Sequence, residues 1–144
     1  MEKAYAVEIY KYGAPDVLTY SEVALMPHST HEVRIRTLVS GVNHTDLEIR
    51  VGNWPVRKTN PFPYIPGVEV VGVLEEVGQG VREHARGQTV ITMMQGLGGV
   101  RGERAGSYAA FVAVDAAAVA AIPTGVDPVH MAALGLVGVT AITD

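Results

Sequence analysis

The most regular pattern in this chain is the stretch Pro63-Tyr64-Ile65-Pro66-Gly67-Val68-Glu69-Val70-Val71-Gly72-Val73-Leu74-Glu75-Glu76-Val77-Gly78. Its two prolines fix the backbone φ angle and make the first part of the stretch stiff. From Val68 to Val77 the β-branched valines dominate, which favours a β-strand. Gly78 and Gly80 then supply residues suited to a tight turn. The stretch therefore predicts a strong strand between a stiff loop and a turn.

Short β-branched runs continue this pattern on both sides. The chain of 144 residues has 16 glycines and 8 prolines, which punctuate it at short intervals. Such spacing is typical of a small barrel or sandwich. The predicted strands are residues 4–10, 18–25, 32–39, 68–77, 89–94 and 108–114. We therefore expect a mainly β fold with short helices.

An early helix is predicted after the third strand. Thr45 and Glu48 match the spacing of a capping box, in which two side chains bond to backbone amides at the helix start. Gly52 is placed to end the helix in a left-handed conformation. The sequence thus predicts one short helix that begins near Thr45.

A second helix is predicted after Asp127-Pro128, an N-cap residue followed by proline at the first helical position. We expect one face of this helix to carry His130, Met131, Leu134 and Val137. Because the helix is apolar nearly all round, it suits burial better than exposure. Three interpretations stay open: the helix packs on its own barrel, pairs in a homodimer, or meets a surface that this chain lacks.

Composition and charge exclude several functions. The net charge is −4 and no run of basic residues occurs, so neither nucleic acid nor an anionic membrane is an expected partner. With no cysteine, the chain forms no disulfide and no thiolate metal site. The first residues lack the apolar run of a signal peptide, and the most apolar stretch, 112–122, is too short to span a bilayer. A cytoplasmic location is therefore expected.

Two loops and a histidine pair bear on ligand binding. Residues 53–67 contain four prolines, which predicts an irregular and stiff loop. Residues 96–102 are rich in glycine but do not match G-x-G-x-x-G, because Arg101 stands at the sixth position. We expect a flexible surface loop there and no Rossmann turn in the chain. His28 and His31 flank a turn after a proline and are expected to be solvent-exposed rather than metal ligands.

Five segments, taken in order and spacing, resemble the medium-chain dehydrogenase/reductase superfamily. The resemblance implies a GroES-like catalytic domain, a partly open β-barrel, over residues 1–126. It also implies that residues 127–144 begin a connecting helix toward a nucleotide-binding domain missing from this chain, so the gene is expected to continue. The segments are 40–52 (SGVNHTDLEIRVG), 63–78, 80–81 with 85–90 (ARGQTV), 106–112 (GSYAAFV) and 132–141 (AALGLVGVTA).

Departures from the family pattern bear on metal binding. Zinc-dependent members carry a cysteine ligand where this chain has Asn43 and a histidine ligand where it has Val68. Neither residue serves zinc in that manner. The chain therefore resembles the zinc-free quinone oxidoreductase and enoyl reductase branch. Gly135 stands where proline is common, which is expected to loosen the second helix.

The resemblance implies hydride transfer from a nicotinamide, NADPH or NADH, to a small electrophile. Without zinc, hydrogen bonds or water must polarise the acceptor, which favours a quinone, an enone or another activated carbonyl or alkene. The chain by itself is expected to bind NADPH weakly and to show no turnover, because the phosphate-binding turn is missing. The alternative is a stand-alone GroES-like module for binding or assembly.

The resemblance also implies site residues, each with a simpler structural explanation. Asn43 would lie near nicotinamide and substrate, or cap the first helix. His44 would act as a donor or acid, or be solvated. Asp46 would hold the cleft loop, or favour the positive end of the helix dipole. Thr140 would approach the nicotinamide, or be a plain helix residue.

Two aromatic residues and one carboxylate complete the set. Trp54 and Tyr64 would wall the substrate pocket, or simply anchor the proline-rich loop. Glu69 is expected to be buried in a strand. A buried carboxylate needs a partner, and an arginine is the expected one.

Overall fold

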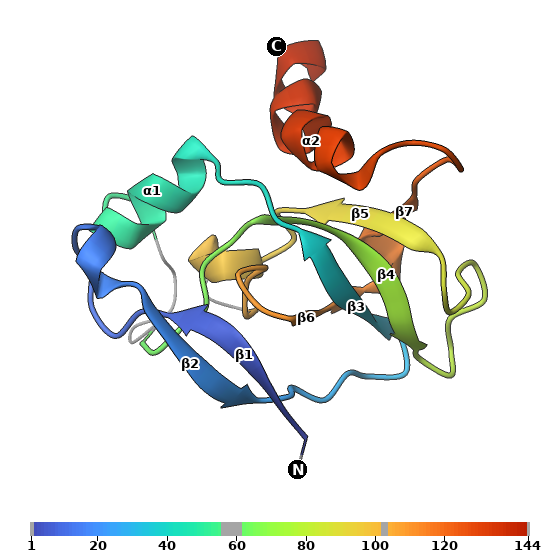
Figure 1. Ribbon diagram of the computed structural model, residues 1–144, viewed down its shortest axis with the longest axis horizontal. Helices are drawn as coiled ribbons and strands as arrows, with labels where there is room; N and C mark the ends of the chain where they lie inside the picture. Colours follow the sequence, from blue (N-terminus) through green and yellow to red (C-terminus); the bar gives the residue numbers. More distant parts are fainter. Residues whose placement is uncertain (1, 56–61, 102–103, 144) are drawn as a thin grey trace.

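Figure 1 shows the computed structural model of the chain, which describes residues 2–55, 62–101 and 104–143. The described part forms seven strands, two α-helices and three short 3₁₀ turns, so it is mainly β as expected. The strands are β1 (Lys3–Glu8), β2 (Thr19–Ala24), β3 (Glu32–Val39), β4 (Glu69–Val77), β5 (Thr89–Met93), β6 (Phe111–Asp115) and β7 (Ala120–Ala121). The helices are α1 (His44–Val51) and α2 (Pro128–Thr143).

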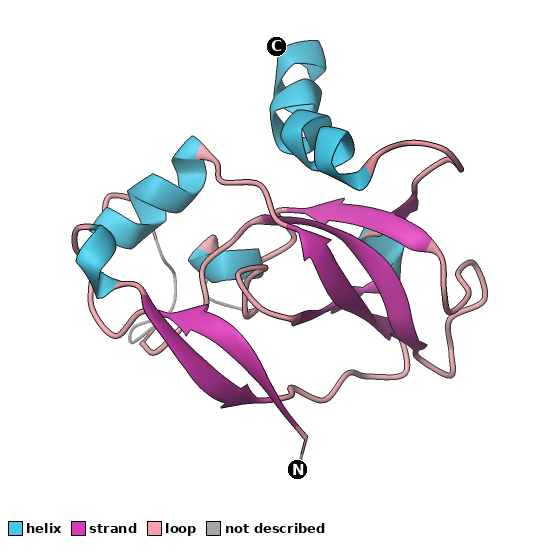
Figure 2. Ribbon diagram, viewed as in Figure 1, coloured by secondary structure: helices cyan, strands magenta, loops and turns pink. Residues whose placement is uncertain are grey.

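The strands form two antiparallel sheets, seen in magenta in Figure 2. β1 and β2 make a two-stranded ribbon, and the larger sheet has the order β6-β3-β4-β5-β7. β4 therefore lies at the centre of the larger sheet, between β3 and β5. Register shifts between Arg34 and Ile35 and between Thr37 and Val39 mark irregularities that bend a sheet. This arrangement is the partly open, GroES-like barrel that the sequence predicted.

β4 is buried on both faces because its side chains alternate between two core clusters. Val70 and Leu74 point into the main core inside the barrel. Val71 points to the other face, where it packs with Ile91 and with Ala132 of α2. β4 thus packs against the barrel core on one face and against α2 on the other, and Figure 1 shows α2 beside this sheet.

Several predicted ends are confirmed. Gly52 has a left-handed conformation at the end of α1. Asp127 caps α2, since its side chain accepts a hydrogen bond from the Val129 N–H at 2.8 Å. The predicted start of α1 was wrong by two residues. The N-cap is Asn43, and its backbone N–H donates a hydrogen bond to the Asp46 carboxylate rather than to Glu48. The Asn43 side chain is also held by β4, because Asn43 Nδ2 donates a hydrogen bond to Glu69 Oε2.

The glycine-rich segment is the clearest correction. It was expected to be a flexible surface loop, but Leu97, Gly98, Gly99 and Val100 are all buried, with Leu97 in the main core. A 3₁₀ turn covers Leu97–Gly99, and Gly98 has a φ of +64°. An added Cβ at Gly98 would lie 2.5 Å from the Gly67 carbonyl oxygen, so glycine is needed for close packing here. Gly102 lies outside the described residues.

Three smaller expectations also differ from the structure. The last long strand begins at Phe111, three residues later than predicted, because Ser107 and Tyr108 N–H groups bond to the 65–67 loop instead. α2 buries Ala132 and Gly135, whereas Leu134 and Val137 of the expected face are exposed. His28 is only partly exposed. In the proline-rich loop, residues 56–61 lie outside the described part.

None of the helices that the structure describes is long and apolar enough to cross a membrane.

Candidate functional site

The start of α1 is held by two reciprocal bonds. Asn43 has an extended backbone, as an N-cap residue should. The Asp46 carboxylate accepts a hydrogen bond from the Asn43 N–H at 2.8 Å, and the Asp46 N–H donates to the Asn43 carbonyl oxygen at 3.0 Å. Both residues are buried. The helix start is therefore a fixed platform rather than a frayed end.

Glu69, the first residue of β4, joins this platform to α2. Its Oε2 atom accepts a hydrogen bond from Asn43 Nδ2 at 2.9 Å and another from the Leu136 N–H at 3.3 Å. Burial of Glu69, which is 1% exposed, was predicted correctly, but its partners are amides rather than the expected arginine. These amide donors supply hydrogen bonds to Oε2 without burying a second charge.

Two glycines make room for the Glu69 carboxylate. A Cβ atom on Gly135 would lie 2.8 Å from Glu69 Oε1, and one on Gly41 would lie 3.2 Å from the same atom. α2 continues without interruption through Gly135. The missing side chain at 135 therefore lets the helix close on Glu69.

Further polar groups surround Asn43 and Glu69. The Ser40 hydroxyl donates to the Glu69 carbonyl oxygen at 2.9 Å, and its oxygen lies 2.5 Å from the Ser107 hydroxyl. Burial raises the pKa of Asp46, although the bond from the Asn43 backbone acts in the opposite direction. Burial also raises the pKa of Tyr108, and the neighbouring Asp46 carboxylate adds to that effect. These groups form a largely buried polar cluster at the start of α1.

Sequence reasoning missed Ser40, Ser107 and Tyr108 as members of this cluster. All three fall inside segments that carry the family resemblance. No local pattern distinguished them, because a serine next to a glycine, as at Ser40 and Ser107, is common in turns of any kind.

Trp54 and Tyr64 lie on the loop that follows α1, and each donates a hydrogen bond to a backbone carbonyl group. The Trp54 Nε1–H donates to the Val100 carbonyl oxygen at 2.9 Å, and the Tyr64 hydroxyl donates to the Ile49 carbonyl oxygen at 3.4 Å. Both rings pack against a cluster that includes Ile49, Val68 and Val100. Burial raises the pKa of Tyr64. The two residues anchor their loop, and their role as pocket walls stays a prediction.

His44 and Thr140 lie on the surface. The His44 side chain is 85% exposed, with Nε2 lying 3.7 Å from Glu48 Oε1. Thr140 is exposed, and its hydroxyl donates to the Leu136 carbonyl oxygen at 3.1 Å. The structure thus brings Asn43, Asp46 and Glu69 together and leaves His44 and Thr140 accessible. Their catalytic and cofactor roles stay predictions.

The surroundings of Asn43 differ from the ligand set of the zinc-dependent enzymes. Within the ranges that the structure describes, no three histidine or carboxylate side chains are grouped so as to hold a metal ion. The Asn43 amide nitrogen is committed to Glu69, and Val68 is fully buried among apolar side chains. The two positions that hold zinc ligands in zinc-dependent enzymes therefore hold an amide and a hydrocarbon.

Two surface cavities lie away from this cluster. One, of about 210 Å³, lies between the β1–β2 ribbon and the β3–β6 edge and is lined mainly by alanine and other apolar side chains, with Arg34 and Arg104. The other, of about 410 Å³, is formed by residues 87–89 and 121–126 and by Pro128. Neither is lined by Asn43, Asp46 or Glu69.

Comparison with known sequences places these residues in context. The family described as "Alcohol dehydrogenase GroES-like domain" matches residues 29–124. The chain is 34% identical over 95 residues to a quinone oxidoreductase from Sus scrofa, which covers 65% of this chain and 28% of that protein. It is 34% identical over 136 residues to a 2-haloacrylate reductase from a Burkholderia species, which covers 94% of this chain and 39% of that protein. The chain spans well under half the length of these curated relatives.

Solved structures match over almost the whole chain. A quinone oxidoreductase from Coxiella burnetii gives a TM-score of 0.89 at 20% identity, covering 99% of this chain and 44% of that one. A mycobacterial protein solved in complex with NADPH gives a TM-score of 0.81 at 29% identity, covering 96% of this chain and 39% of that one. The first likeness bears on the fold alone.

Proposed function

Because the chain belongs to the alcohol dehydrogenase GroES-like domain family, within the medium-chain dehydrogenase/reductase superfamily, we propose that it is the catalytic-domain portion of an NADPH-dependent, zinc-independent oxidoreductase. The acceptor of the hydride is a quinone, an enone or another activated carbonyl or alkene. The names of the relatives support this class, since quinones and 2-haloacrylates both contain electron-poor double bonds.

One observation of this structure carries the zinc-independent part of the proposal. The Asn43 amide nitrogen is engaged with Glu69 at 2.9 Å, at the position where zinc-dependent enzymes have their cysteine ligand. An amide can offer zinc only its carbonyl oxygen, which is a poorer ligand for zinc than a thiolate or an imidazole. A reaction at this site then depends on an acceptor that is already electron-poor.

The fit of the nucleotide to the described residues is partial. The glycine-rich segment at residues 96–100 is buried and starts no helix, so it does not supply a phosphate-binding turn. When bound, the nucleotide supplies hydride to the acceptor. The chain's own residues fit the nicotinamide end only: Asn43 would be the buried hydrogen-bonding group, and Thr140 an exposed hydroxyl.

The other proposed site residues support Asn43 or contact the substrate. Asp46 keeps Asn43 in place through the helix cap. Trp54 and Tyr64 would form the apolar wall for the substrate, and exposed His44 would act as a donor at the rim. The expected partner of α2 is the nucleotide-binding domain, which is absent from this chain.

The experiment is an NADPH titration of the purified 144-residue chain, followed by NADPH oxidation with 1,4-benzoquinone. We expect weak or no binding and no turnover. The same assay on the whole product of the gene should show quinone-dependent oxidation that EDTA does not change. Loss of activity in EDTA with recovery on adding zinc, or oxidation of simple alcohols, would overturn the zinc-independent assignment.

A second candidate function rests on α2. Its exposed side chains include Leu134 (64%), Val137 (53%) and Ile142 (86%), an apolar surface that favours association. In this alternative the chain is a stand-alone binding or assembly module. A partner protein, or a second copy of the chain in a homodimer, would cover the apolar surface of α2. Sedimentation velocity over a range of concentrations, combined with the NADPH titration, distinguishes this candidate from the oxidoreductase. Association of the whole gene product without any NADPH binding favours the module.

A further inference from the structure

We propose that Glu69 is a positioning residue that couples the seating of α2 to the orientation of the Asn43 side chain. A single atom, Glu69 Oε2, accepts hydrogen bonds from Asn43 Nδ2 and from the Leu136 N–H. Asn43 lies at the start of α1 and Leu136 in the middle of α2. One carboxylate oxygen therefore connects two helices that are far apart in the sequence. The consequence for catalysis rests on the proposed function, but the coupling itself does not.

The carboxylate has no alternative way to satisfy its bonds. Glu69 is 1% exposed, and its other oxygen, Oε1, is buried without a hydrogen-bond partner among the described residues. Leaving a buried polar atom without partners is costly. Rotation of the carboxylate would move Oε2 away from both donors. The position of Oε2 thus depends on where Asn43 and Leu136 hold it.

α2 acts on Glu69 in two ways. Its Leu136 N–H holds Oε2, and its Gly135 leaves the space that Oε1 occupies, since a Cβ at residue 135 would lie 2.8 Å from Oε1. A shift of α2 toward the sheet would push the carboxylate, and a shift away would remove a donor. Either movement changes the acceptor that orients the Asn43 amide.

The helix offers a matched pair of substitutions. Gly135→Ala places a methyl group against Glu69 Oε1, whereas Gly138→Ala, one turn further along α2, meets nothing within 4 Å. Replacing glycine by alanine inside a helix ordinarily favours the helix. The two variants should therefore have different effects on hydrogen exchange of the Leu136 amide: faster exchange in Gly135→Ala, and unchanged or slower exchange in Gly138→Ala. Because the added methyl also lies 2.8 Å from Ile91 Cδ1, Ile91→Val is combined with Gly135→Ala to remove that contact.

The readout is NMR spectroscopy of the ¹⁵N-labelled chain, with hydrogen exchange of the Leu136 amide. In G135A, with or without I91V, we expect the Asn43 side-chain amide signals to move and Leu136 exchange to accelerate about tenfold through local opening. G138A should leave the Asn43 signals in place and leave Leu136 exchange unchanged or slower. Glu69→Met, which removes the acceptor, should move the Asn43 signals, whereas Glu69→Gln, which keeps one acceptor oxygen, should largely preserve them.

The outcomes separate this inference from the proposed function. Unmoved Asn43 signals in a folded G135A protein would overturn the coupling, whatever the enzyme assay shows. Moved Asn43 signals together with a whole gene product that reduces no quinone would keep the coupling and overturn the proposed function. If E69M does not fold, G135A against G138A still decides.

Discussion

Asn43 Nδ2 and Glu69 Oε2 lie 2.9 Å apart, so a hydrogen bond joins the start of α1 to the start of β4. The backbone N–H of Asn43 is held at the same time by Asp46. Two donors of one residue are thus fixed by two buried carboxylates from different segments. Such a residue has little freedom to reorient, which is what a site that must present an amide to a ligand requires.

Substitution of Asp46 tests the helix cap. Asp46→Ala removes the acceptor for the Asn43 N–H and should lower the free energy of unfolding by about 1 kcal/mol. Asp46→Asn keeps an acceptor oxygen and should cost less. Urea denaturation at pH 7 measures both. Equal losses in the two variants would contradict a capping role.

The pH dependence of the same residue follows from its burial. Burial raises the pKa of Asp46 above 3.8, so the folded state binds this proton more tightly than the unfolded state does. Its contribution to stability is fully present below the unfolded pKa and is lost as pH rises through the raised pKa. D46N should lack this part of the pH profile, which begins near pH 3.8 and extends upward through the raised pKa. An unchanged profile would show that Asp46 ionises normally.

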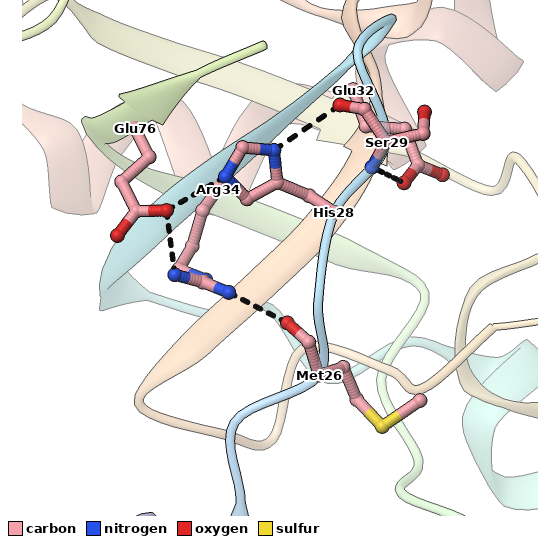
Figure 3. Close-up of polar contacts among 6 residues, drawn as sticks. All are labelled: Met26, His28, Ser29, Glu32, Arg34 and Glu76. Carbon is pink, nitrogen blue, oxygen red and sulfur yellow. Dashed lines mark hydrogen bonds and ion pairs between the residues drawn. The ribbon is translucent and has the colours of Figure 1, made fainter. Parts of the chain in front are cut away.

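Glu76 should behave in the opposite way. Figure 3 shows its carboxylate meeting two partners: Oε2 lies 2.7 Å from His28 Nε2 and 2.7 Å from Arg34 Nη1. Arg34 also donates to the Met26 carbonyl oxygen at 2.7 Å, so the group ties the 26–28 linker to the sheet. The hydrogen bond from His28, with Arg34 assisting, lowers the pKa of Glu76 below 4.5.

The stability that Glu76 contributes is therefore present above pH 4.5 and lost as pH falls through its lowered pKa. Glu76→Gln should lower the unfolding free energy at pH 7 by less than about 1 kcal/mol, since the carboxylate is half exposed. It should have no effect near pH 2. Thermal denaturation across this range measures it, with Glu75→Gln as control because Arg36 approaches Glu75 only to 3.4 Å. A larger effect of E75Q would refute this account.

Leu97 tests the burial of the glycine-rich segment. Leu97 is 0% exposed, so Leu97→Ala should lower the unfolding free energy by roughly 2–5 kcal/mol. The same change at Leu134, which is 64% exposed, should cost less than about 0.5 kcal/mol. Guanidinium denaturation measures both variants. Similarly small effects of both substitutions would indicate that the segment is a flexible surface loop.

Gly98 and Gly87 separate packing from backbone conformation. Both have positive φ angles, +64° and +93°, so alanine is strained at either position by about 1 kcal/mol or more. Only at Gly98 would the added Cβ meet the Gly67 carbonyl oxygen, at 2.5 Å; at Gly87 it meets nothing within 4 Å. G98A should therefore lower the melting temperature more than G87A. Equal shifts would mean that the backbone conformation alone is responsible.

Much of the fold could be predicted from local patterns. The valine-rich run before Val77 became the central strand β4, Gly52 ended α1, and Asp127 capped α2. These features depend on side-chain alternation and on backbone groups within a few residues, so a single stretch of sequence contains the information needed. Asn43 and Asp46 came from the family resemblance, and the structure places them together.

The rest depended on contacts between distant segments. Thr45 and Asn43 were both acceptable caps by local rules, and the contact with Glu69 favours Asn43. The segment at residues 96–100 looked like a mobile loop because glycine suits both flexible loops and close packing. Ser40, Ser107 and Tyr108 carried no local signal at all.

The sequence by itself determined which segments of this chain form the six longer strands and the two helices, and it located the end of α1 at Gly52 and the start of α2 at Asp127. These features follow from interactions within one turn or one strand. Only the tertiary structure decided that amides rather than an arginine satisfy Glu69 and that glycines at 41 and 135 make room for it. The physical reason is that a buried carboxylate takes its partners from whatever elements pack around it, and that packing is set by the whole sheet.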